Sequence, residues 1–397
     1  MIQQDPGHGD ETTGPPHHRR TRRSRRPDRA RGTRTPDRLS TTNPLPGIEQ
    51  GGESYEALAT GGPPSEGGSV YGRLWNPTVA RFESALAELE HAEAAVAFAT
   101  GMAAFSAALL AFTGTTGRRH VIGVRPLYGG TDHLLATGLL GTAVTFCRPD
   151  QVAASVRSDT ALVVMETPAN PTLELVDIRA VAEQAGAVPV LVDNTFATPV
   201  LQNPLDHGAA LALHSATKYI GGHGDVMGGV LACSDELAER IRPIRAITGA
   251  ILHPLAGYLL HRGLATMPLR VHAQQETAIQ VAQWLTGHAG VAEVFYPGLH
   301  GDPSGLIGSQ LRGTGAMVSI RLAGGFAAAE RLTSRVRLFT HAVSLGGVDS
   351  LIESPAALTH RPVTADAKPD SGLVRMSIGL ESADDLIADL ACGLHPN

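Results

Sequence analysis

The chain contains few lysines, and one of them stands where an amine could act as a nucleophile. Among 397 residues only Lys218 and Lys368 carry an ε-amine. Lys218 follows an apolar run that predicts a buried strand, has hydroxyls beside it at Ser215 and Thr217, and precedes a glycine-rich turn. Burial disfavours an ammonium ion and lowers its pKa, as Schiff-base chemistry requires. The simpler alternative is a lysine that only ends a strand. Lys368 lies in a polar, turn-like segment and is predicted to be exposed.

Two further patterns could bind a charged group. Asp193 directly follows a second apolar run, and a carboxylate there needs a cationic or hydrogen-bonding partner, such as a protonated pyridine nitrogen. Its alternative role is that of a turn or helix N-cap residue. At Thr100-Gly101-Met102 a predicted strand turns into a predicted helix, whose free N–H groups suit a phosphate. Taken alone, this motif is more often an ordinary strand–helix turn.

These residues need a framework, and the hydrophobic pattern predicts one. Short apolar or β-branched runs predict strands at 94–99, 120–124, 143–147, 161–165, 188–192, 211–214 and 226–233. Helices are predicted at 79–91, 102–112, 130–140 and 177–185. Strands that alternate with helices predict an α/β fold, with a mainly parallel sheet that is covered on both faces and binds ligands at the carboxyl ends of its strands.

After Pro254 the pattern changes. A long helical stretch at 255–287 is followed by strands near 317–322 and 375–378 and by a helix at 383–394. This order predicts a smaller C-terminal α+β domain.

Charge is unevenly distributed along the chain. Residues 1–48 contain ten arginines against five acidic residues, and the remainder contains 22 basic and 33 acidic residues. Such an acidic body is a poor candidate for wrapping DNA. The segment 1–48 is rich in Arg and Pro and predicts a disordered, solvated tail, with a polyanion-binding arm as the less favoured alternative.

Cysteine and histidine usage indicates a cytoplasmic protein without a metal. Cys147, Cys233 and Cys392 are odd in number and far apart, which predicts reduced thiols, and the first forty residues lack an apolar signal segment. The uncharged run 94–112 is interrupted at Thr100-Gly101, so a buried strand and helix are predicted there and no membrane span. None of the 17 histidines has a ligand spacing such as HExxH, so no metal is predicted.

A series of motifs follows in order from Gly51 to the end of the chain. They are Tyr71-Gly72-Arg73 with Asn76-Pro77-Thr78, Thr100-Gly101-Met102, Leu127-Tyr128-Gly129-Gly130-Thr131, Glu166-Thr167-Pro168-Ala169-Asn170-Pro171, Val192-Asp193-Asn194-Thr195, Ser215-Ala216-Thr217-Lys218-Tyr219 and Arg375-Met376-Ser377-Ile378-Gly379. With these motifs the chain resembles the Cys/Met-metabolism enzymes that use pyridoxal 5'-phosphate (PLP).

The resemblance implies the PLP-dependent transferase fold type I, with a mainly parallel seven-stranded sheet domain and a smaller C-terminal α+β domain. It divides the chain into the tail at 1–48, an arm at 49–78 that contacts a neighbouring subunit, a PLP-binding domain at 79–254 and a C-terminal domain at 255–397.

The resemblance also implies roles around the cofactor. Lys218 would form the Schiff base with PLP and move protons, Asp193 would pair with the pyridine nitrogen, and Tyr128 would stack on the ring and is a candidate base. The phosphate would be held by backbone groups of Gly101 and Met102 and by the side chains of Ser215 and Thr217.

Substrate and subunit contacts are implied in the same way. Arg375 would clamp the substrate α-carboxylate in bidentate fashion, with Asn170 and Ser344 assisting. Tyr71 and Arg73 would reach the cofactor phosphate of a neighbouring subunit, and Tyr71 would also lie near the substrate. The active unit is therefore expected to be at least a homodimer, and a homotetramer is expected.

The resemblance also indicates which reactions of the family to expect. Members that act on cystathionine carry Glu before Ser-Leu-Gly, whereas Val343 stands there in this chain, as in methionine γ-lyases, and Thr248-Gly249-Ala250 is similar to those lyases too. Gly130 and Arg245-Ala246 depart from the Cys and the Lys-Asp that the lyases carry. We expect α,γ-elimination from L-methionine or a related sulfur amino acid, giving a 2-oxo acid, ammonia and a thiol. The alternatives are cystathionine γ-lyase activity, or γ-replacement as in cystathionine γ-synthase and homoserine sulfhydrylase.

Overall fold

The computed structural model describes residues 36–66, 68–114, 116–365 and 367–395. One compact unit begins at Arg38, ten residues before the end that the sequence predicts for the tail. Within this unit the Arg38 N–H donates to Thr78 Oγ1 over 2.8 Å, and Thr42 forms a β-bridge with Tyr71. The predicted disorder of residues 1–35 falls outside the described residues.

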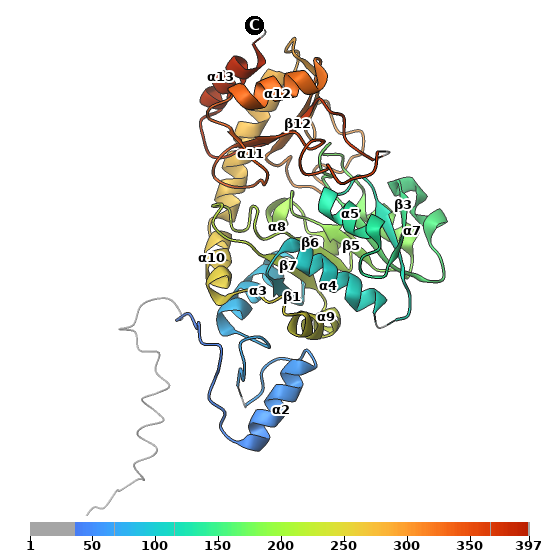
Figure 1. Cartoon of the computed structure of the whole chain (residues 1–397), viewed down its shortest axis with the longest axis vertical. Helices are drawn as coiled ribbons and strands as arrows, with labels where there is room; N and C mark the ends of the chain where they lie inside the picture. Colours follow the sequence, from blue (N-terminus) through green and yellow to red (C-terminus); the bar gives the residue numbers. More distant parts are fainter. Residues whose placement is uncertain (1–35, 67, 115, 366, 396–397) are drawn as a thin grey trace, which may run out of the picture. The chain divides into compact units, whose positions relative to one another are not determined.

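A seven-stranded sheet in the order β1-β7-β6-β5-β4-β2-β3 forms the larger domain (Figure 1). Its strands are β1 (Ala94–Phe98), β2 (His120–Val124), β3 (Ala143–Cys147), β4 (Thr160–Glu166), β5 (Val190–Asp193), β6 (Leu211–His214) and β7 (Gly229–Cys233). Strands β3, β2, β4, β5 and β6 pair in parallel, and β7 runs antiparallel to both β6 and β1. The predicted seven-stranded, mainly parallel sheet is confirmed.

Helices cover both faces of this sheet, because successive strand residues face opposite sides. Val121 belongs to the core cluster under α4, whereas the next residue, Ile122, belongs to the cluster under α7. The covering elements are α3 (Pro77–Leu89), α4 (Gly101–Thr113), α5 (Gly129–Thr137), α6 (Val152–Ser155), α7 (Ile178–Ala185), α8 (Thr198–Leu201) and α9 (Asp235–Thr248), with short 3-10 turns η2 (Pro149–Gln151) and η3 (Pro204–His207).

A five-stranded mixed sheet forms the smaller C-terminal domain, in the order β10-β11-β12-β9-β8. Its strands are β8 (Val291–Phe295), β9 (Met317–Leu322), β10 (Thr340–His341), β11 (Leu351–Glu353) and β12 (Leu373–Ser377). In Figure 1, α12 (Gly325–Arg335) and α13 (Ala383–Leu394) lie beside this sheet. One core cluster continues from Phe82 on α3 through Leu260 and Val281 to Leu390 on α13, so the two sheets share a core.

One predicted helix differs from the structure, and several helices, among them α2 (Ile48–Ala59), α9 and α12, were not predicted. The stretch 255–287 is two helices, α10 (Pro254–Leu264) and α11 (Met267–Leu285), because Pro268 lacks an N–H and restricts the residue before it. Helix α9 was not predicted, and it contains Pro243. Helix α2 was not predicted either; it is held by packing, with Leu58 buried against Leu74.

Candidate active site

A cavity of about 410 Å³ opens at the carboxyl ends of the parallel strands, where the C-terminal domain closes over them. Such a volume suits a small-molecule ligand. The predicted site residues that line it are Gly101, Met102, Tyr128, Asn170, Asp193, Ser215, Thr217, Lys218, Ser344 and Arg375. They come from seven segments that are far apart in the sequence.

Lys218 lies half-buried in the cavity wall. Its Nζ donates a hydrogen bond to Ser344 Oγ over 2.8 Å. Burial, and then the positive charge of Arg375, lower the pKa of Lys218 to about 8, although the carboxylate of Glu353 raises it. A sizeable fraction of this amine is therefore neutral and nucleophilic near neutral pH. The other lysine, Lys368, is exposed, as predicted.

The turn that carries Lys218 is fixed from both sides. The Lys218 N–H donates to the Ser215 carbonyl at 3.1 Å, and the Gly222 N–H donates to the Lys218 carbonyl at 2.8 Å. Buried Arg270 donates from Nη1 to the Tyr219 carbonyl at 2.9 Å. This bracing keeps the side chain of Lys218 directed into the cavity.

Asp193 ends β5 directly opposite Glu166, the last residue of β4. Asp193 Oδ1 accepts from the Thr195 N–H at 3.0 Å, so this residue also closes a turn. Burial raises the pKa of Asp193, while the Thr195 hydrogen bonds and the charge of His214 lower it. A cationic ligand atom beside Asp193 would offset the cost of burying this carboxylate.

Glu166 organises two neighbouring site residues, a role that sequence reasoning missed. Its Oε2 accepts from the Tyr128 N–H at 2.8 Å, and its Oε1 accepts from the Asn170 N–H at 3.0 Å. Burial, and then the charge of Asp193, raise the pKa of Glu166 well above its ordinary value. The sequence placed Glu166 in a motif but contained no local signal that its carboxylate faces Tyr128.

The N-terminus of α4 lies close to the turn at residues 215–222 that carries Lys218, called the lysine turn below. Thr100 Oγ1 caps the Ala103 N–H at 3.0 Å, which leaves the N–H groups of Gly101 and Met102 without partners inside the helix. A Cβ on Gly101 would lie 3.0 Å from Ser215 Cβ, so glycine permits this approach. The free N–H groups, the hydroxyl of Ser215 and the positive end of the helix offer a cradle that could hold a phosphate.

Arg375 enters the cavity from β12 with its guanidinium 2% exposed. Nη1 donates to Asn170 Oδ1 at 2.9 Å, Nη2 donates to the Ser344 carbonyl at 3.2 Å, and Nη2 forms a 2.5 Å ion pair with Glu353. Burial lowers the pKa of Arg375 and Glu353 raises it, and a guanidinium remains charged at physiological pH. Sequence reasoning missed Glu353, which lies on the three-residue strand β11.

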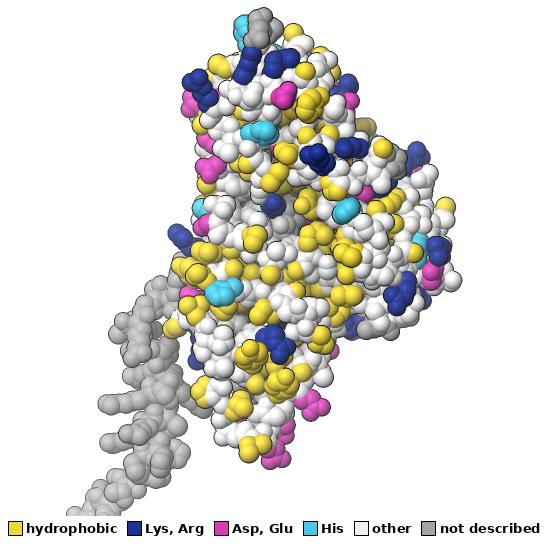
Figure 2. Space-filling model, viewed as in Figure 1, with side chains coloured by type: hydrophobic (Ala, Val, Ile, Leu, Met, Phe, Trp, Pro, Cys, Tyr) yellow, Lys and Arg dark blue, Asp and Glu magenta, His cyan; other side chains and the backbone are white. Residues whose placement is uncertain are grey.

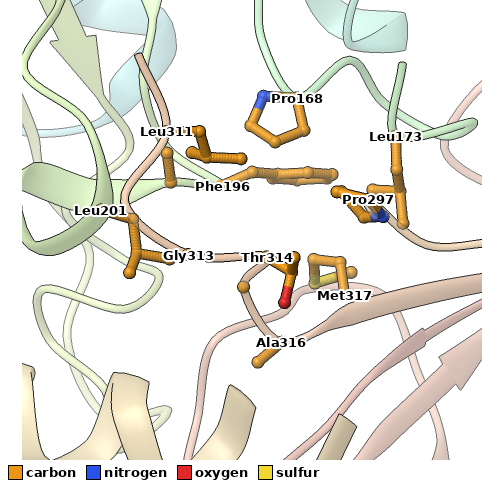
Figure 3. Close-up of a pocket in the computed structure, with 12 residues that line it drawn as sticks. Pro168, Leu173, Phe196, Leu201, Pro297, Leu311, Gly313, Thr314, Ala316 and Met317 are labelled. Carbon is orange, nitrogen blue, oxygen red and sulfur yellow. The ribbon is translucent and has the colours of Figure 1, made fainter. Parts of the chain in front are cut away.

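Phe196 forms part of the cavity wall on the side of the Arg375 guanidinium, whose Cζ lies 5.9 Å from the ring centroid. Figure 3 shows the apolar residues behind this ring, among them Pro168, Leu173 and Met317. They leave a free volume of only about 10 Å³, so this side of the cavity is packed.

Tyr71 and Arg73 do not line the cavity of their own chain. The Arg73 guanidinium lies 5.5 Å from the Tyr71 ring centroid, and Arg73 Nη1 donates to the Ala246 carbonyl at 2.9 Å. Tyr71 is 39% exposed. Tyr128, which does line the cavity, is 38% exposed, and burial of its hydroxyl raises its pKa.

Comparison with known proteins identifies the family. Residues 49–395 match the family described as "Cys/Met metabolism PLP-dependent enzyme". The chain belongs to this family. The family expected from the sequence motifs is therefore confirmed, and so is the dependence on PLP.

Individual relatives agree with this membership. A protein of Brevibacterium sandarakinum named L-methionine gamma-lyase is 60% identical, covering 90% of this chain and 91% of that protein. Another of that name, from Streptomyces avermitilis, is 52% identical, with 89% and 82% covered. The crystal structure of metB from Corynebacterium glutamicum superposes with a TM-score of 0.84 at 35% identity, covering 92% of this chain and 94% of that chain.

The cavity suits the cofactor of this family. The cradle at Gly101 and Ser215 offers N–H and hydroxyl groups for a phosphate, the Lys218 amine is partly neutral, and the Asp193 carboxylate needs a cationic partner. In the part of the chain that the structure describes, no group of three or more His, Cys, Asp and Glu side chains is arranged to hold a metal ion. No helix among the described residues is long and apolar enough to cross a membrane.

Proposed function

We propose that this PLP-dependent enzyme is a carbon–sulfur lyase that cleaves L-methionine or a related sulfur amino acid by α,γ-elimination. Its products would be a 2-oxo acid, ammonia and a thiol. The observation that carries the proposal is one cavity that contains a lysine amine with a lowered pKa, a carboxylate at Asp193 and a guanidinium at Arg375. Relatives that are 52–60% identical and are named L-methionine gamma-lyase support it.

The cofactor would lie between the α4 N-terminus and β5. Lys218 would hold its aldehyde carbon, Asp193 would accept a hydrogen bond from its pyridinium, and Tyr128 would cover one face of its ring. Its phosphate would take hydrogen bonds from the N–H groups of Gly101 and Met102 and from the hydroxyls of Ser215 and Thr217. When bound, PLP supplies an electron sink that makes hydrogens of an attached amino acid acidic.

Proton transfer would fall to Lys218 and Tyr128. The Lys218 amine, once free, would remove the α-proton, and its bond to Ser344 Oγ would aim it at the substrate. The raised pKa of Tyr128 keeps its hydroxyl protonated at neutral pH. The Tyr128 hydroxyl could therefore donate a proton to the departing sulfur.

The substrate would be held at both ends. Arg375 would clamp the α-carboxylate, with Asn170 and Ser344 beside it. On the other side, Val343 lines the cavity and is 52% exposed. An apolar side chain there suits a thioether tail better than the charged distal end of cystathionine.

One observation keeps a second candidate open. A Cβ at Gly130 would lie 2.6 Å from Tyr128 Cε1, so the tyrosine ring fills the space where the methionine lyases that the sequence resembles carry a cysteine. Solved structures titled cystathionine gamma synthase are 37–38% identical. Cleavage or synthesis of cystathionine is therefore the alternative that the experiment must separate.

The active unit would be a homodimer that shares its active sites, assembled into a tetramer in the cytoplasm. Tyr71 and Arg73 lie outside their own cavity, so they would serve the phosphate of a neighbouring copy, and residues 49–78 would form the contacting arm. Figure 2 shows hydrophobic side chains on the face that carries α2, α3 and α10. Ile48 and Leu255, which belong to α2 and α10, are 97% and 50% exposed.

Within one subunit, the domains at 79–254 and 255–397 would act together around each site.

A substrate panel tests the proposal. Purified holoenzyme would be incubated with L-methionine, with L-cystathionine, and with O-acetyl-L-homoserine plus L-cysteine, and the products would be separated by chromatography. We expect 2-oxobutanoate and methanethiol from methionine at the highest kcat/KM. Faster formation or cleavage of cystathionine would favour the alternative, and no turnover of any sulfur amino acid would refute the proposal.

A further inference from the structure

Glu353 stands directly behind the guanidinium that faces the cavity. It pairs with Arg375 across the antiparallel strands β11 and β12. The side chains are 1% and 2% exposed, and Glu353 Oε1 binds Arg375 Nη2. The same oxygen accepts from Thr359 Oγ1 at 3.1 Å. The second oxygen, Oε2, is buried and has no hydrogen-bond partner among the described residues.

A ligand carboxylate would approach Arg375 from the other side. Arg375 lines the cavity together with Asn170 and Ser344, whereas Glu353 does not. The guanidinium would then be placed between two carboxylates, one from the protein and one from the ligand. A buried site that holds two anions against one guanidinium is costly, because little water screens their repulsion.

Other charges around this pair come from several elements. Lys218 in the lysine turn and His341 on β10 favour the anion of Glu353, as does the hydroxyl of Thr359 in the loop after β11. Toward Arg375 the titratable groups are those of Glu166, Tyr128, Tyr219, Lys218 and His360. Burial raises the pKa of Glu353 above its ordinary value. Once PLP holds the Lys218 amine, the ammonium form of Lys218 no longer balances a second carboxylate.

We propose that Glu353 is the resident counter-anion of Arg375 and takes up one proton from solvent when a ligand carboxylate binds the guanidinium. The proton adds to Oε2, the oxygen without a partner, and Oε1 continues to accept from Arg375. Glu353 is thus a positioning residue that exchanges its charge for that of the substrate. The inference rests on the proposed function in one respect, the assignment of Arg375 as the carboxylate site.

The test measures protons with a ligand that cannot react. The probe is 4-(methylsulfanyl)butanoate, which has the carboxylate and thioether of methionine but no amino group. Its binding to the holoenzyme is measured by calorimetry at pH 8 in buffers of different ionisation enthalpy. The measured binding enthalpy is plotted against the ionisation enthalpy of the buffer, and the slope gives the number of protons taken up per site. We expect an uptake of about one proton by the wild-type enzyme.

Two variants assign that proton. Glu353→Gln keeps an oxygen that accepts from Arg375 but removes the charge, so we expect uptake to vanish and the probe to bind about tenfold more tightly. The matched control is Glu293→Gln. Glu293 pairs with Arg321 across strands of the same sheet at 2.9 Å, but that pair is exposed, so this variant should behave as wild type.

The outcomes are separable. Binding to the wild type without proton uptake overturns this inference and leaves the proposed function intact. Weaker binding to Glu353→Gln also overturns it, since Glu353 would then only orient the guanidinium. If the probe does not bind, or binds equally well to an Arg375→Gln variant, the assignment of Arg375 fails and the inference fails with it. Because the wild-type slope needs no variant, the test survives a misfolded substitution.

Discussion

Replacing Gly101 by alanine would test the phosphate cradle without removing any polar group. The new Cβ would lie 3.0 Å from Ser215 Cβ and 3.1 Å from Ser215 Cα, which is too close, so the α4 N-terminus must move by a few tenths of an ångström. Hydrogen bonds to charged groups contribute about 1.5–3 kcal/mol each. We expect a loss of about half of one such bond, or about 0.75–1.5 kcal/mol, which weakens PLP binding about four- to twelvefold.

The assay is a titration of apoenzyme with PLP, followed by absorbance, with thermal unfolding of the apoenzyme measured in parallel. The matched control is Gly290→Ala in the turn before β8, where the added Cβ meets no atom closer than 3.6 Å, and its Kd for PLP should equal that of the wild type. An unchanged Kd for Gly101→Ala would refute the cradle. An equal loss in both variants would show that the effect is not local.

Three further predictions address other parts of the molecule. We propose the neutral amine of Lys218 as the nucleophile. Because burial lowers its pKa to about 8, the rate of PLP capture by apoenzyme should rise with pH and level off above about 8. A rise that continues toward pH 10.5 would contradict this role. Glu83→Ala leaves the buried guanidinium of Arg245 without its 2.6 Å ion pair, so the free energy of unfolding in urea should fall by about 3 kcal/mol. A fall of less than about 1 kcal/mol would show that this ion pair does not stabilise the fold. Val343→Glu places a charge beside the thioether tail, so it should lower kcat/KM for methionine by about tenfold and leave PLP affinity unchanged. A variant with the same kcat/KM as the wild type would show that this position does not select the substrate.

The larger sheet could be predicted because each of its strands is a short apolar run with a clear end. The strands 120–124, 143–147 and 211–214 have the predicted bounds. Strand β7 begins at Gly229 rather than at 226, because the Gly228 N–H and carbonyl bond to Thr217 in the lysine turn. That tie joins segments distant in the sequence, so no local pattern contains it.

The candidate site was predicted from sequence motifs, so a residue outside those motifs, Glu353, was missed. Lys218 and Asp193 each have a chemical type and a place at the end of a strand that local reasoning can detect, and Arg375 was found through its motif on a predicted strand. Glu353 lies on a strand of three residues, too short for a periodic signal, and its importance arises from its register with Arg375. Register between strands depends on how the whole sheet assembles, so it appears only in the structure.

The central claim is that the amine of Lys218 holds PLP. Borohydride reduction of the holoenzyme fixes the cofactor covalently to the amine that holds it, and digestion followed by mass spectrometry locates the label. With only two lysines in the chain, the result is unambiguous. We predict that the label lies on the peptide containing Lys218. Label on Lys368 instead, or an unlabelled Lys218 in yellow and fully active enzyme, would contradict the account.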